Sequence, residues 1–109
     1  MIKAVIYHDA NGIIKGFRVK GHAGYSTAGE DIVCSAVSAI VFTALGGLDE
    51  LAGFRNFTEH DGFLECHVPD NLEETQKHIA DIILKTMAIG LRQIEADYGK
   101  YIRIKYEEV

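Results

Sequence analysis

The stretch that decides the fold is residues 32–48, IVCSAVSAIVFTALGGL, which contains no charged residue. Val33, Val37 and Val41 recur at helical spacing, and further apolar residues occupy the other faces of the same helix. A helix that is apolar on most faces must be buried on most faces. We therefore expect a central helix that begins near Glu30, where acidic residues complement the helix dipole. Because a domain of 109 residues is too small to surround such a helix, part of its surface is expected to meet another subunit.

The remaining segments predict an α+β domain around this helix. Alternating apolar residues flank two turn signals, Asn11-Gly12 and Asp61-Gly62, and each combination is typical of a β-hairpin. A second, amphipathic helix is expected from an N-cap at Asn71, with Glu74 completing a capping box, to an end at Gly99. A final alternating strand follows. The order ββαββαβ predicts a single two-layer domain over residues 1–109, with a mostly antiparallel sheet and two helices packed on one side.

The charge balance restricts the class of partner. The chain has 11 basic and 16 acidic residues and a formal net charge of −5. A surface of that sign repels phosphate backbones, so we expect no direct nucleic-acid partner unless a local basic patch overrides the total. The same charge favours a basic peptide or protein as the partner.

Three features bear on location. The two cysteines do not make a disulfide framework and suit a reducing compartment. Residues 1–12 lack the apolar core and the cleavage site of a signal peptide. The apolar run 32–48 is short and contains Cys, Ser, Thr and Gly residues, which is unfavourable for a membrane span. We therefore expect a cytoplasmic protein that has no membrane partner.

Cys34 is the strongest candidate for chemistry. It follows a glycine-rich segment, GHAGYSTAG (21–29), and is expected within the first turn or so of the central helix. Unsatisfied backbone N–H groups and the dipole at a helix N-terminus favour the thiolate, which is the nucleophilic form. The alternative is that Cys34 is a small apolar residue packed in the helix, which is the usual behaviour of a cysteine outside a disulfide.

Three other residues could support Cys34. His22 lies on the segment that leads into the helix, and a neutral imidazole within hydrogen-bond reach is the usual activator of a thiol, although His22 could also be an exposed loop residue. Asp31 could orient the imidazole, or could act only as a charge at the helix N-terminus. Ser38 lies one turn after Cys34 and could support the site or bond back to a carbonyl of the preceding turn.

The remaining reactive residues carry weaker signals. Cys66 alternates with Leu64 and Val68, and this pattern favours a core position. No Cys-x-x-Cys pair or ordered histidine spacing supports a zinc site, so we expect no metal and no cofactor. The other histidines are expected to be solvated: His8, His60, His67 and His78.

Gly21-His22-Ala23, followed by GEDIVCSAVS (29–38), resembles the signature of the ribosomal-processing cysteine protease family, Prp. Those bacterial enzymes remove a short N-terminal extension from a large-subunit ribosomal protein. The resemblance extends over essentially the whole chain in length and element order. It implies His22 as the general base, Cys34 as the nucleophile, a homodimer, and cleavage after an aromatic residue. Ser35 stands where alanine is expected in many relatives, which is a small departure.

The resulting hypothesis is a cysteine endopeptidase that processes a ribosomal protein precursor with a Cys34–His22 dyad. The alternative is a non-catalytic module that binds a ribosomal protein during assembly, with Cys34 merely packed. The loop between the two dyad residues is expected to order over a bound peptide. This loop is Ala23, Gly24, Tyr25, Ser26, Thr27, Ala28 and Gly29, and Gly21, just before His22, is expected to contact the substrate with it.

Overall fold

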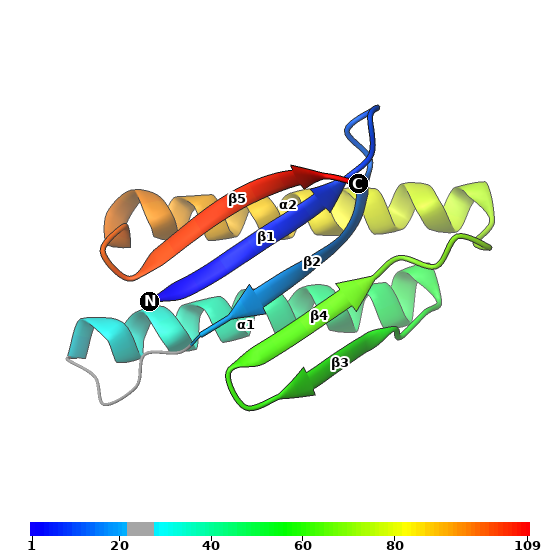
Figure 1. The fold of residues 1–109 in the computed structure, drawn as a ribbon. Coiled ribbons are helices and arrows are strands. Elements are labelled where there is room, and N and C mark those ends of the chain that lie inside the picture. Colours follow the sequence, from blue (N-terminus) through cyan, green and yellow to red (C-terminus); the bar gives the residue numbers. More distant parts are fainter. Residues whose placement is uncertain (22–27) are drawn as a thin grey trace.

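The computed structural model describes residues 1–21 and 28–109, and the side chains of residues 1–21 and 32–109. The elements follow the order ββαββαβ, which confirms the predicted fold class (Figure 1). They are β1 (Ile2–His8), β2 (Ile14–Lys20), α1 (Ala28–Ala52), β3 (Phe57–His60), β4 (Phe63–His67), α2 (Glu74–Tyr98) and β5 (Ile102–Glu108).

The five strands form one sheet in the order β3-β4-β2-β1-β5. All neighbouring strands are antiparallel except β1 and β5, which are parallel because α2 crosses over between β4 and β5. Helices α1 and α2 lie side by side on one face of the sheet, and the opposite face is open (Figure 1). The predicted packing of two helices on one side is therefore correct.

The core lies between the sheet and the two helices. Ile6 and Phe17, which are partners across β1 and β2, have no exposed surface, and neither does Leu84 of α2. The two helices approach closely at glycines: a Cβ atom at Gly90 would lie 3.1 Å from the Ile40 side chain. Small residues at these crossing points let the helices pack tightly and cover the inner face of the sheet.

Two helix starts differ from the sequence expectation. Helix α1 begins at Ala28 instead of Glu30, so Ala28 and Gly29 belong to the helix and not to the loop. Alanine is the best helix former, and the acidic pair after Gly29 still falls in the first turn, where it complements the dipole. Helix α2 begins at Glu74, and its capping box is formed by Glu73 and Gln76 in place of Asn71 and Glu74.

Helix α1 also leaves apolar surface exposed. By length and mean hydropathy alone (1.8 over Ile32–Ala52), it is apolar enough to cross a membrane, which the sequence analysis did not expect. A core helix passes the same test, and Val33, Val41 and Leu48 are buried in the domain core. On the other side of the helix, Phe42 and Leu51 are exposed at 44% and 66%.

Asp81 is a buried carboxylate that joins α2 to the first hairpin. It accepts hydrogen bonds from the Ile14 backbone N–H at 2.9 Å and from Lys85 Nζ at 2.7 Å. Asp81→Ala leaves the Ile14 N–H buried without a partner and is expected to lower the free energy of unfolding by about 1–3 kcal/mol. Asp81→Asn keeps an acceptor and should lose less. Chemical denaturation checks this, and an alanine variant as stable as wild type would contradict the role.

Candidate active site

A pocket of about 160 Å³ opens between the N-terminal half of α1 and the β3–β4 hairpin. Cys34 and Ser38 line it from α1, and Gly21 lines it from the end of β2. The rest of the lining is largely apolar and comes from β1, β2, α1 and the β3–β4 hairpin. These residues are Ile2, Val19, Val37, Val41, Phe42, Glu59, His60, Gly62, Phe63 and Leu64.

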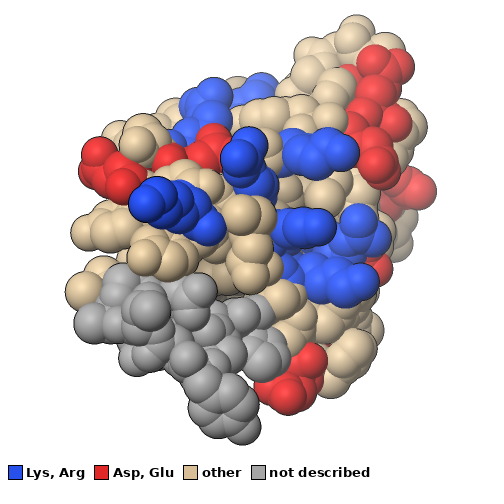
Figure 2. Space-filling model, turned by 60° about the vertical axis from the view of Figure 1, so that its left-hand side comes forward, with Lys and Arg blue, Asp and Glu red and all other residues tan. Residues whose placement is uncertain are grey.

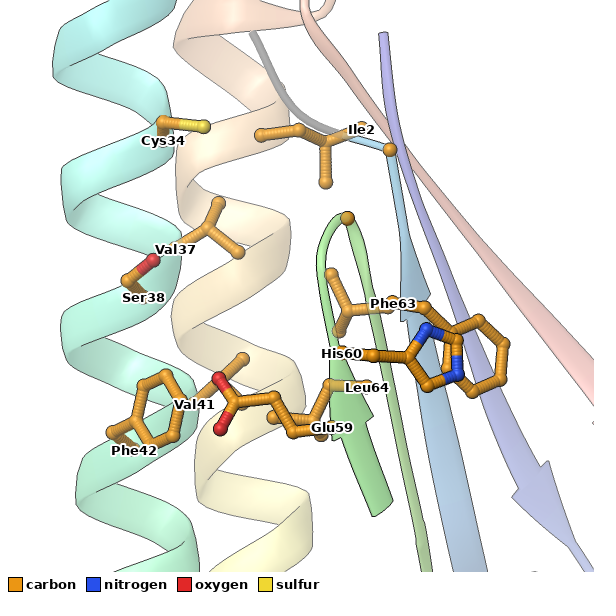
Figure 3. A pocket seen from close by; sticks show the side chains of 13 residues that line it. Ile2, Cys34, Val37, Ser38, Val41, Phe42, Glu59, His60, Phe63 and Leu64 are labelled. Atoms are coloured by element: carbon orange, nitrogen blue, oxygen red, sulfur yellow. The ribbon is translucent and has the colours of Figure 1, made fainter. Parts of the chain in front are cut away.

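Cys34 is half-buried at one end of this pocket, and its sulfur points from α1 toward Ile2 (Figure 3). Because α1 starts at Ala28, Cys34 is the seventh residue of the helix, two residues further from its start than the sequence predicted. The influence of the dipole falls off within the first turn of a helix, and Cys34 lies beyond that turn. A thiol at this position would need a neighbouring base to act as a nucleophile.

Cys66 lies in a very different environment. It is on the inner side of β4, has no exposed surface, and is paired with Phe17 across the sheet. Burial raises the pKa of the Cys66 thiol from 9.0 to about 12. At neutral pH this group is a protonated thiol inside the core, as the alternation of Leu64, Cys66 and Val68 predicted.

The residue before the predicted base has a restricted conformation. Gly21 has a φ of +90°, in the left-handed region that glycine adopts without strain. A Cβ atom at this position would collide with the Met1 carbonyl oxygen, and the Gly21 N–H donates to the Gly62 carbonyl oxygen at 2.8 Å. Glycine is therefore required where the chain leaves β2 beside the pocket that contains Cys34.

Several predicted site residues lie outside the described part of the structure. His22 and the loop residues Ala23, Gly24, Tyr25, Ser26 and Thr27 are among them, and the side chain of Asp31 is also not described. Their roles stay predictions.

Ser38 lies where the sequence analysis placed it, one turn after Cys34 on the same face of α1. Within the described residues its hydroxyl forms no bond back to the preceding turn, whereas Thr43 of the same helix donates to the Ala39 carbonyl oxygen at 2.6 Å. The Ser38 hydroxyl is therefore available to the pocket.

The β3–β4 hairpin supplies five lining residues that the sequence analysis did not assign to the site, and two of them, Glu59 and His60, have ionisable side chains. Glu59 points toward α1, and its carboxylate lies near Phe42 (Figure 3). His60, the next residue, points away from α1 and stacks on Phe63 with the ring centroids 4.8 Å apart. A four-residue strand has too little alternation to show which face each side chain takes. Glu59 places an acidic group in the pocket, and His60 does not approach Cys34.

No group of three or more His, Cys, Asp or Glu side chains suited to a metal ion occurs among residues whose side chains the structure describes. The pocket lining instead combines a thiol, a hydroxyl and a carboxylate with apolar walls. Such a site can bind an extended peptide and attack its carbonyl carbon through sulfur.

Comparison with known proteins identifies close relatives over nearly the whole chain. The family model for cysteine protease Prp matches residues 1–103. The ribosomal processing cysteine protease Prp of Bacillus subtilis is 32% identical over 107 residues, covering 95% of this chain and 96% of the relative. Two crystal structures of the essential ribosomal processing protease Prp from S. aureus superpose with TM-scores of 0.83 and 0.84, at 29% and 28% identity. Both cover 98% of this chain and 100% of the other, one with a covalently linked product peptide and one with a substrate peptide.

Proposed function

The chain belongs to the cysteine protease Prp family, and from this membership we propose that it removes the N-terminal extension of a large-subunit ribosomal protein precursor. The S. aureus relatives were crystallised with a substrate peptide and with a covalently linked product peptide, which supports covalent catalysis on a peptide. We propose that the reaction takes place in the cytoplasm, where the two thiols stay reduced.

The single observation that carries the proposal is the contrast between the two cysteines. Cys34 is half-buried and lines a pocket, whereas Cys66 is enclosed in the core with a pKa of about 12. Only a thiol that a peptide can approach, and that a base can deprotonate at neutral pH, can act as the nucleophile. Cys34 meets the first of these conditions, and Cys66 meets neither.

In the proposed reaction, the Cys34 sulfur attacks the scissile carbonyl carbon and His22 takes the thiol proton. The carbon–nitrogen bond then breaks, His22 gives the proton to the leaving amine, and a thioester remains on Cys34. Water hydrolyses the thioester and restores the thiol. Backbone N–H groups in the first turn of α1 have no carbonyl partner within the helix and are proposed to stabilise the oxyanion. Asp31 and Ser38 are proposed as supporting residues.

The pocket lining supports a substrate with a bulky apolar residue at the cleavage site. Val37, Val41 and Leu64 give the pocket apolar walls, and Phe42 and Phe63 border it. Glu59 adds a negative charge, which suits the lysines and arginines that are common in ribosomal proteins. This lining fits the cleavage after an aromatic residue that the family resemblance implies.

Alkylation tests whether Cys34 is activated. We expect iodoacetamide to label Cys34 much faster than Cys66 near pH 7, because a thiol with a pKa of about 12 contains almost no thiolate at that pH. Mass spectrometry of the labelled peptides gives the two rates. Exposure alone also favours Cys34, so the His22→Ala variant separates the two readings. It should slow the Cys34 reaction and not the Cys66 reaction if Cys34 is activated, whereas the non-catalytic binding module, with Cys34 merely packed, predicts no change at either cysteine.

We also propose that the protein acts as a homodimer. A groove of about 620 Å³ runs along the outer side of the two helices, and its lining is mostly apolar. Leu51, Ile82 and Ile89 line this groove and are exposed at 66%, 51% and 47%. The second copy would cover this apolar surface and so bury the faces of α1 that the domain leaves open.

A further inference from the structure

The open face of the sheet carries a concentration of basic side chains. The helices cover the other face, so alternate strand residues point outward (Figure 1). Five of the eleven Lys and Arg residues occupy such outward positions on the three neighbouring strands β2, β1 and β5. We call them the basic face: Lys3, Arg18, Lys20, Arg103 and Lys105. Figure 2 shows Lys and Arg side chains gathered on one side of the molecule.

The strand register sets these cations in two rows. Lys3 is the partner of Lys20 on β2 and of Arg103 on β5, so three cations lie in one row across the sheet. In the next outward row, Val5 is the partner of both Arg18 and Lys105. Neighbouring strands are about 4.8 Å apart, so each row brings its charges close together.

The fold itself does not explain this arrangement. Like charges directly opposite each other destabilise a sheet, and Lys3 faces two of them. Among the residues whose side chains the structure describes, no carboxylate forms an ion pair with any member of the basic face. Two carboxylates share this face: Glu65 is the partner of Arg18, and Glu107 is the partner of Tyr7 in the next outward row. The five cations outnumber them although the chain has an overall charge of −5. An external anion would offset the repulsion.

The first row continues into aromatic side chains. Phe63 is the partner of Lys20, and His60 is the partner of Phe63. The row therefore crosses all five strands, with aromatic rings on β3 and β4 and cations on β2, β1 and β5. The two rings are stacked, with an angle of 8° between their planes. A cationic track combined with aromatic rings is the surface that single-stranded nucleic acids use, with phosphates on the cations and bases against the rings.

We infer that the basic face binds the phosphate backbone of single-stranded RNA. The row of rings and cations favours RNA over an acidic peptide or a lipid surface, neither of which has bases to stack. The choice of RNA over other nucleic acids rests on the proposed function, because a ribosomal protein precursor is handled where ribosomal RNA is present. The expectation of no nucleic-acid partner came from the total charge, and this face is a local exception to it.

The five cations of the basic face lie on the other side of the sheet from Cys34. The cations lie on the side of the sheet that the helices leave open, whereas Cys34 lies on α1 on the opposite side. His60 and Phe63, at the end of the first row, also line the pocket, so RNA bound along this row would reach the pocket edge while its phosphates stay on the other side of the sheet from Cys34.

Fluorescence anisotropy with a labelled, unstructured RNA tests this inference. The protein used is the full chain with Cys34→Ala, so binding is measured without proteolysis. Each phosphate contact to a single strand contributes about 0.7 to the slope of log affinity against log salt, so five contacts predict about a hundredfold loss of affinity between about 50 and 200 mM salt. Lys3→Gln with Lys105→Gln should weaken binding and reduce the slope by about 1.4.

The matched control is Lys77→Gln with Arg92→Gln on α2, which removes the same charge from the other layer. This control should bind RNA as the parent protein does. Equal weakening by both double variants would overturn the inference, as would tighter binding to polyglutamate or to anionic vesicles than to RNA. In the protein with Cys34 intact, the Lys3/Lys105 variant should cleave a short peptide normally. If no form of the protein cleaves the peptide but RNA binding is preserved, the proposed function is refuted and the RNA-binding inference is not.

Discussion

Replacing Cys34 by alanine is expected to lower peptidase activity at least about a thousandfold while the protein stays folded. The side chain is half-buried at the end of a pocket, so its removal leaves the core intact. Cys34→Ser should be nearly as inactive, because a hydroxyl is a far weaker nucleophile at a site that is built to deprotonate a thiol. The measurement is cleavage of a peptide that spans the junction of the precursor extension, followed by mass spectrometry.

Cys66→Ala is the matched control for this prediction. It removes the other sulfur, which is fully buried, so we expect full activity and a loss of about 1–2 kcal/mol in the free energy of unfolding. Circular dichroism should show the native fold for both alanine variants. Cleavage that survives in Cys34→Ala and disappears in Cys66→Ala would reverse the assignment of the nucleophile.

The second large effect is expected at the groove between the helices. Leu51→Glu combined with Ile82→Glu places two carboxylates on the proposed dimer surface and should raise the dissociation constant of the dimer at least about a hundredfold. Both side chains are exposed in the single chain, so each monomer should stay folded. Analytical ultracentrifugation over a range of concentrations measures the effect. A wild-type protein that is monomeric at high micromolar concentration would contradict the dimer.

Two controls separate association from folding. Ala96→Glu adds a charge at an exposed position of α2 that does not line the groove, and it should leave the dimer unchanged. The second control uses Leu45→Glu and Val41→Glu, also on α1. The wild-type side chains at these positions are buried, with exposed fractions of 6% and 3%. A buried carboxylate without a partner costs several kcal/mol, so these two variants are expected to be insoluble or unfolded, not monomeric.

The sequence predicted the fold well because its signals are local. The charge-free run 32–48, the Asn-Gly and Asp-Gly turns and the long amphipathic helix each specify one element, and the order of elements follows from them. The start of α1 was harder to place, since Ala28 and Gly29 carry no periodic apolar pattern. That difference of two residues makes Cys34 the seventh residue of the helix instead of the fifth.

The site was only partly accessible to sequence reasoning. Cys34, Ser38 and Gly21 were identified, and the structure brings all three to one pocket. Glu59 was missed because its position facing α1 depends on the pairing of β3 with β4, which is a long-range property. The basic face was missed for a similar reason, because its five cations come from three segments that only the sheet brings together. The negative total charge of the chain also gave no sign of a basic surface.

The most direct test of the central claim is to trap the covalent intermediate. The wild-type protein is mixed with the precursor peptide, quenched in acid at early times, digested with trypsin and analysed by mass spectrometry. The two cysteines fall in different tryptic peptides, residues 21–55 for Cys34 and 56–77 for Cys66. We predict that the 21–55 peptide gains the mass of the N-terminal extension as a thioester. Peptide cleavage with the adduct on the 56–77 peptide, or with no adduct on either cysteine at any time, would contradict the account.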